Sequence, residues 1–117
     1  MRDWQAYRAR FVRDDVNTRI GGVAANFARI QSAAGNDAHF EIVRNMIQDS
    51  EYLLEWTAPD AKIETAGELV EMQVQLAYWH RVWHQIWNER LQRQAMAAQV
   101  GKWSEHLLDI SGLLNER

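Results

Sequence analysis

The pair His80 and His84 is the sequence feature most able to carry chemistry. On a helix, two residues four positions apart lie on one face, so both imidazoles can reach the same metal ion, as they do in zinc-binding helices. Two ligands do not complete a site, and a third would come from His39, from His106 or from a carboxylate such as Glu105. Zinc or another divalent ion held in this way could activate water for hydrolysis or group transfer.

The residues around these histidines complete no established metal motif. Arg81, not a glutamate, follows His80, which excludes the arrangement of the zinc metalloproteases. No aspartate or glutamate lies three residues before any histidine, which excludes the Glu-x-x-His signature of di-iron bundles. We therefore expect no cofactor, with one histidine of the pair packed and hydrogen-bonded and the other solvated. Metal binding is the alternative hypothesis.

Three tryptophans accompany the histidines at helical spacing, Trp79, Trp83 and Trp87. Indole rings stacked along a helix can line a pocket for an apolar or tetrapyrrole ligand between helices. An aromatic stripe with this period is more often part of a hydrophobic core, because each ring buries a large apolar area. The spacing predicts a buried helix face, with a ligand pocket as the second interpretation.

The same helix carries apolar residues on the face opposite the tryptophans. Val70, Val74 and Tyr78 recur every four residues there, and Arg81 follows them. A second apolar face requires a cover, from a neighbouring helix or from another subunit. We expect these four residues to form an interaction surface and the protein to be a homodimer.

Four segments with helical periodicity must position these residues, and no alternating pattern indicates a strand. The sequence predicts an all-α protein of one domain, residues 1–117, folded as a four-helix bundle with up-down-up-down antiparallel topology. The predicted segments are 16–34, extended backwards to Trp4; 37–56; 60–87; and 94 to the C-terminus, with Leu114 in the last apolar stripe.

The predicted boundaries depend on a few turn and cap residues. Gly35, Asn36 and Asp37 should end the first segment and cap the second, and the only proline, Pro59, should end the second. A reversal is expected at residues 88–91, although no glycine or proline is present there. Gly21 and Gly22 should admit a close helix crossing, with a kink as the alternative, and Asp14 or Asp15 should act as a cap or a salt-bridge partner.

Composition excludes several classes of function. The chain of 117 residues has no cysteine, so disulfides, thiolate metal sites and cysteine nucleophiles are absent, which fits a cytoplasmic protein. Its net charge is -3 and it has no basic stripe, so we expect no nucleic-acid binding. No apolar run approaches the ~20 residues of a membrane span, so we expect no membrane partner. Eleven arginines against two lysines favour bidentate ion pairs, as in a subunit contact.

These observations predict a tryptophan-rich, non-enzymatic module for protein–protein interaction, regulation or assembly that acts as a helical homodimer. Its further protein partner is not specified by the sequence. The alternative is a metal-binding helical bundle in which His80 and His84 support a hydrolase or transferase activity. No nucleophile elbow or phosphate-binding loop is present to suggest a third chemistry.

Overall fold

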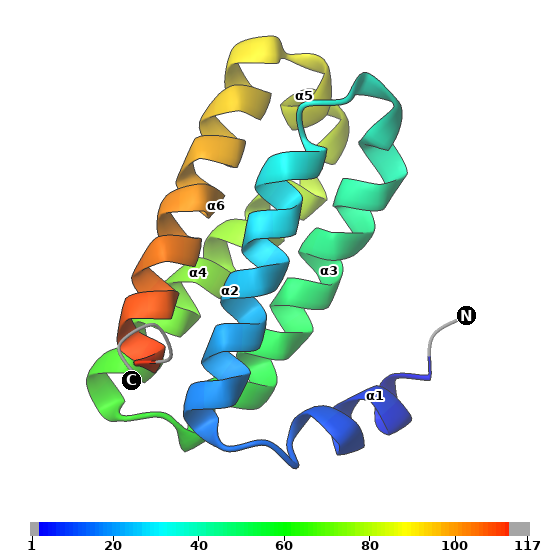
Figure 1. Ribbon diagram of the computed structural model, residues 1–117. Coiled ribbons are helices and arrows are strands. Elements are labelled where there is room, and N and C mark those ends of the chain that lie inside the picture. The colour runs from blue at the N-terminus through cyan, green and yellow to red at the C-terminus, as the bar shows by residue number, and fades with distance from the viewer. Residues whose placement is uncertain (1–2, 113–117) are drawn as a thin grey trace.

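The computed structural model describes residues 3–112, and nearly all of them are helical (Figure 1). The all-α prediction is confirmed, but six α-helices are present in this part of the chain, not four. Two 3-10 helices join them. In chain order the elements are α1 Trp4–Phe11, α2 Val16–Ala33, η1 Asp37–His39, α3 Phe40–Thr57, η2 Ala58–Asp60, α4 Ile63–Arg81, α5 Trp83–Asn88 and α6 Arg90–Ser111.

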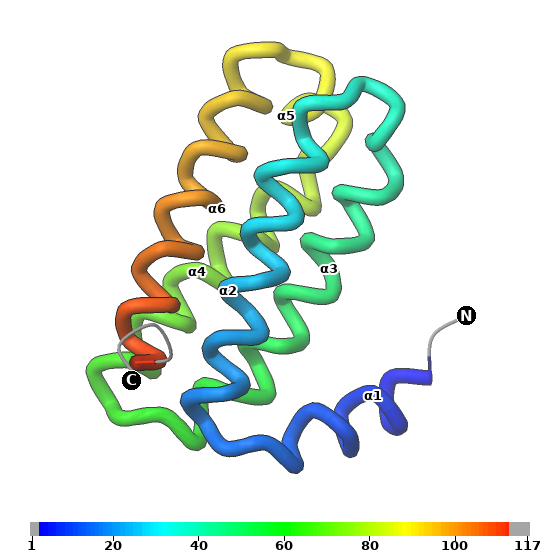
Figure 2. The backbone as a smooth tube through the Cα atoms, in the orientation of Figure 1, coloured from blue at the N-terminus to red at the C-terminus, as the bar shows by residue number. Residues whose placement is uncertain are grey.

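The four long helices α2, α3, α4 and α6 run side by side, and the chain reverses direction from each one to the next (Figures 1 and 2). Helix α2 packs against both α3 and α6, while α3 packs against α2 and α4. Helix α5 lies at the far end of α4 and contacts α6. Helices α4 and α6 are therefore each supported mainly by a different neighbour, α4 by α3 and α6 by α2.

The first predicted segment is two helices, because Asp15 starts a new one. Its backbone is extended, with φ -68° and ψ 167°, and its carboxylate accepts a hydrogen bond from the Thr18 amide at 2.8 Å. This hydrogen bond, together with one from the Thr18 side chain, lowers the pKa of Asp15, as expected for an N-cap carboxylate. The prediction that the 16–34 helix extends back to Trp4 is thus wrong, whereas a capping role for Asp15 is confirmed.

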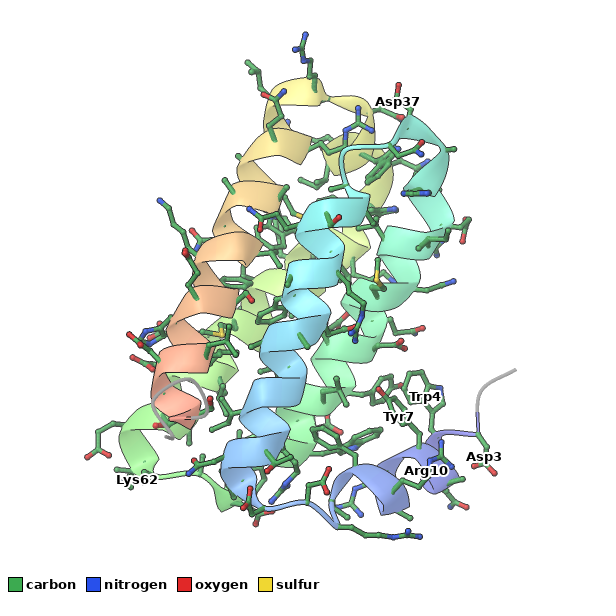
Figure 3. All side chains as sticks on the ribbon, viewed as in Figure 1. Asp3, Trp4, Tyr7, Arg10, Asp37 and Lys62 are labelled. Atoms are coloured by element: carbon green, nitrogen blue, oxygen red, sulfur yellow. The ribbon has the colours of Figure 1, made fainter. Side chains whose placement is uncertain are left out.

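Helix α1 turns away from α2 and reaches the end of α3 through aromatic rings. Trp4 and Tyr7 point toward that end of α3 (Figure 3). Their ring centroids lie 4.1 Å from Tyr52 and 5.6 Å from Trp56, respectively. The apolar residues that resemble a helical extension in the sequence therefore serve a separate contact.

The third predicted segment is also interrupted. Pro59 lies in η2 and Ala61 is extended, so α4 begins at Ile63. Val82, with φ -107° and ψ 31°, then ends α4 and α5 begins at Trp83. The continuous 60–87 helix is therefore wrong. The predicted reversal at residues 88–91 is confirmed, because Glu89 adopts an extended backbone between α5 and α6.

The core combines aliphatic side chains from all four long helices with tryptophans. Helix α2 is continuous through Gly21 and Gly22, and it approaches α6 closely enough for Ser104 Oγ to donate to the carbonyl of Ala24 at 2.8 Å. The largest fully buried side chains include Ile20, Phe27, Ile30, Ile47, Leu54, Leu69, Leu76, Met96 and Leu107. Leu114, predicted for the last apolar stripe, lies outside the described residues.

No helix within residues 3–112 is both long and apolar enough to cross a membrane.

Candidate functional site

The outward face of α4 carries most of the exposed hydrophobic bulk in the described part of the chain. Of the six large hydrophobic side chains exposed within residues 3–112, four lie on this helix. Ile63 is 83% exposed, Val70 47%, Val74 66% and Tyr78 48%. Exposed apolar residues gathered on one helix face are typical of interaction surfaces, whereas scattered ones are ordinary. The sequence-predicted residues Val70, Val74 and Tyr78 therefore do lie on one open face.

These residues belong to a longer stripe with alternating spacings of four and three residues. We call it the α4 stripe, and its members are Ile63, Gly67, Val70, Val74, Ala77 and Arg81, with Tyr78 at its margin. Such spacing keeps side chains in line along a helix and is the pattern of helices that pair with other helices. Nothing lies within 4 Å of the position a Cβ would occupy at Gly67, so the stripe is open to a partner there.

Arg81 ends the α4 stripe and contacts Tyr78. Its guanidinium carbon lies 5.9 Å from the centroid of the Tyr78 ring, a cation–π distance. The other side of α4 is buried through Leu69, Met72 and Leu76, which pack into the core. One helix thus has two apolar faces, of which only one is covered by the described residues.

The four histidines are not brought together. His39 Nδ1 lies 2.9 Å from the carbonyl oxygen of Ala33, and the His84 ring lies 5.0 Å from the Phe40 ring. His106 Nε2 lies 3.0 Å from a carboxylate oxygen of Glu68. The three rings therefore have three different neighbours. Within residues 3–112, no three His, Asp or Glu side chains are grouped so that they could hold a metal ion.

His80 instead pairs with a carboxylate of α3. Its Nδ1 lies 3.0 Å from Glu51 Oε2, and the two side chains are only 26% and 20% exposed. Burial raises the pKa of Glu51 above its ordinary value of 4.5, and the neighbouring His80 partly opposes this rise. Val82 ends α4 between the two histidines, so His80 lies on α4 and His84 on α5.

The raised pKa of Glu51 predicts a pH-dependent stability. A carboxyl whose pKa is higher in the folded state than in the unfolded state stabilises the fold below the unfolded pKa, and this contribution is lost as pH rises through the folded pKa. Glu51→Gln removes this titration, so the free energy of unfolding of the variant relative to the unaltered protein should increase as pH rises above the ordinary glutamate pKa of 4.5. Urea denaturation at several pH values measures the free energy of unfolding of the variant and of the unaltered protein. Exposed Glu55 provides the control as Glu55→Gln, and parallel pH profiles for Glu51→Gln and the unaltered protein would contradict the prediction.

The three tryptophans at helical spacing, Trp79, Trp83 and Trp87, lie in two different environments. Trp83 and Trp87 lie in the core, with ring centroids 5.4 Å apart, and Trp83 Nε1 donates to the carbonyl of Phe40 at 3.1 Å. Trp79 lies one helix earlier and packs 5.5 Å from Trp103 of α6. Of the three rings, Trp79 lines an open space, and Trp83 and Trp87 are not among the residues that line it.

That space is a groove of about 710 Å³ between α4 and α6, to which α5 contributes Ile86. Sequence reasoning singled out Tyr78, Trp79 and His106 as candidate site residues, but it did not group them, because the two sides of the groove are distant in the chain. The periodicity of α6 marked Met96 and Trp103 as inward-facing without showing which helix they would meet. The lining residues are Glu68, Glu71, Met72, Gln75, Tyr78, Trp79, Ile86, Gln92, Ala95, Met96, Gln99, Trp103 and His106.

The α4 stripe and the groove are adjacent features of one helix, and Tyr78 belongs to both. Comparisons of the chain with protein-family models, with curated proteins and with solved structures find no significant match. A functional assignment therefore rests on this geometry and on the residues that build it.

Proposed function

We propose that this protein is a non-enzymatic helical homodimer that serves as an interaction or assembly module, and that the α4 stripe is its subunit contact. The supporting observation is the exposed apolar line from Ile63 to Val74 on a helix whose other face is already buried. Covering this line removes apolar surface from water, which is the main driving force of association. We further propose that α2, α3, α4 with α5, and α6 act as the four legs of one antiparallel bundle in the cytoplasm.

Charge favours an antiparallel pairing of α4 with α4 of a second copy. Glu64 lies at the start of the stripe and Arg81 at its end. A parallel pair would place Glu64 against Glu64 and Arg81 against Arg81. An antiparallel pair places each glutamate near the opposite arginine, and it also opposes the two helix dipoles favourably.

The spacing of the stripe also fits a two-fold axis. With the axis at the height of Met72, Val70 of one copy is level with Val74 of the other, and Gly67 is level with Ala77. Two valines then meet at the centre, while the small pair Gly67 and Ala77 lets the helix backbones approach closely. A self-complementary surface of this kind is what a two-fold homodimer requires.

Disulfide trapping tests both the dimer and its register, because the natural chain has no cysteine. An equimolar mixture of Val70→Cys and Val74→Cys proteins should give far more cross-linked dimer on mild oxidation than either variant alone. Val70 of one copy and Val74 of the other lie at the same height, which satisfies the Cα spacing of a disulfide. Each residue is instead offset by about 6 Å along the helix axis from the same residue of the other copy.

Native mass spectrometry of the unaltered protein supplies the independent readout. The expected result is twice the chain mass, without added metal. A monomer at micromolar concentration would contradict the homodimer, and a dimer without the mixed cross-link would contradict the α4 register. A matched mixture of Gln94→Cys and Ala98→Cys, two exposed positions four apart on α6, controls for collisional cross-linking.

A further inference from the structure

The groove between α4 and α6 has an apolar floor whose side chains are almost fully buried. Met72 and Ile86 are each 4% exposed, Met96 is 1% and Trp79 is 8%. Its volume of about 710 Å³ lies within the ~300–1,000 Å³ range of small-molecule pockets. The groove is separate from the α4 stripe except at Tyr78, so a ligand held there would not depend on the proposed dimer.

Helices α4 and α6 supply aromatic and polarizable side chains to the lining of the groove. The Trp79 and Trp103 rings lie 5.5 Å apart with an interplanar angle of 33°, one from each side of the groove. Met72 and Met96 line the same groove, and their flexible thioether side chains adapt readily to ligand shape. Indole faces attract cations more strongly than other aromatic side chains do. Tryptophan and methionine side chains together favour a ligand that has an aromatic or apolar group and a positive charge.

Acidic side chains predominate among the ionisable residues that line the groove. Glu68 and Glu71 line it, and no lysine or arginine does. The only basic group is His106, whose Nε2 lies 3.0 Å from Glu68 Oε2. The remaining polar lining consists of glutamine amides and the Tyr78 hydroxyl, which are neutral. An anion would meet two carboxylates, with His106 beside Glu68 as the one basic side chain among the lining residues, so the groove favours positive charge.

We infer that this groove binds a small organic cation, with its apolar or aromatic body over Met72, Trp79 and Trp103 and its ammonium group at the rim beside Glu68 and Glu71. The body replaces water above the floor, and the carboxylates and the indole faces hold the charge. Specificity comes from the pairing of these two features along one groove, because neither a neutral hydrocarbon nor an aromatic acid satisfies both.

A matched pair of probes tests the charge requirement. The cation is 2-naphthylmethyl-trimethylammonium, whose charge does not depend on pH, and the anion is 2-naphthylacetate. Calorimetric titration should show saturable binding of the cation, with at least about tenfold weaker binding of the anion. Tryptophan fluorescence should change with the same midpoint, since Trp79 and Trp103 line the groove.

Two variants test the location, each with a control on the same helix. Glu71→Gln should weaken cation binding about threefold to fivefold, and less so at high salt, whereas Glu64→Gln on the same helix but outside the groove should not. Ala95→Phe fills the groove from α6 and should abolish binding. Ala98→Phe, also exposed on α6 but outside this groove, should leave binding unchanged.

Three results would overturn the inference. They are no saturable binding of the cation up to millimolar concentration, equal binding of the two probes, and unchanged binding by Ala95→Phe. If the unaltered protein does not bind the cation and Ala95→Phe loses the dimer mass, the groove is instead a contact between copies. Circular dichroism of each variant confirms that the helices remain folded before binding is compared.

Discussion

The double variant Val70→Glu/Val74→Glu should remain folded and sediment as a monomer at concentrations where the unaltered protein is a dimer. Both side chains are exposed in the single chain, at 47% and 66%, so the substitutions remove little from the core. In the proposed dimer they lie on either side of the two-fold axis, where two copies would bury four unpaired carboxylates. Each buried, unpaired charge costs several kcal/mol, so we expect the dissociation constant to rise at least about a hundredfold.

Analytical ultracentrifugation across a dilution series provides the measurement. The matched control is Gln94→Glu/Ala98→Glu, which adds the same charge at two exposed α6 positions with the same spacing. If the control dissociates as readily as the α4 variant, net charge rather than the α4 stripe is responsible. A fully dimeric α4 variant would show that another surface joins the subunits.

Leu76→Ala should have the second largest effect, on the stability of the fold. The Leu76 side chain is fully buried in the core on the inner face of α4. Its truncation removes apolar contacts and leaves a cavity that the surrounding helices can only partly fill. Core substitutions of this type cost about 2–5 kcal/mol in the free energy of unfolding. Chemical denaturation should show the loss as a lower midpoint with an unchanged slope.

Val74→Ala is the natural comparison, since it removes apolar bulk two residues earlier on the outer face of the same helix. Measured on dilute, monomeric protein, its effect should stay within about 0.5 kcal/mol, as for surface substitutions in general. At concentrations that populate the dimer it should instead weaken association. Equal losses from Leu76→Ala and Val74→Ala in the monomer would mean that the outer face of α4 is covered within the chain.

Much of the fold could be read from periodicity because burial imposes the helical repeat on the sequence. The predicted inward residues Val23, Phe27 and Ile30 of α2 are fully buried, and so are Val100 and Leu107 of α6. The open face of α4 was predicted for the same reason: Val70, Val74 and Tyr78 share a face that its inward residues do not use. Pro59 also placed the end of α3, whereas the reversal at residues 88–91 was expected because one uninterrupted helix would be too long for a compact domain.

The interruptions were harder to predict because no glycine or proline marks them. Helix α1 departs from α2 where Asp15 takes an extended backbone, and α4 ends at Val82, a residue that fits a helix equally well. In each case distant contacts accompany the break. Trp4 and Tyr7 gain the rings of Tyr52 and Trp56, while Trp83 gains a hydrogen bond to the carbonyl of Phe40. Helical repeats record which residues are buried, but not which distant partner buries them.

The candidate sites divide in the same way. Spacing alone put His80 and His84 within reach of one ion, yet Glu51 of α3 pairs with His80 and Phe40 packs against His84. Spacing alone also grouped the three tryptophans, but the end of α4 at Val82 leaves only Trp79 beside the groove. Partners that come from another helix decide what each of these side chains does.

The sequence by itself determined the all-α class, the inward and outward faces of the long helices and the exposed stripe on α4, because each depends on residues close together in one helix. Only the tertiary structure decided where the helices break and which histidine meets which carboxylate. It also decided that Trp79 and Trp103 form one groove with Glu68 and Glu71. These features depend on contacts between residues far apart in the chain, and the periodicity of a single helix carries no record of its neighbour.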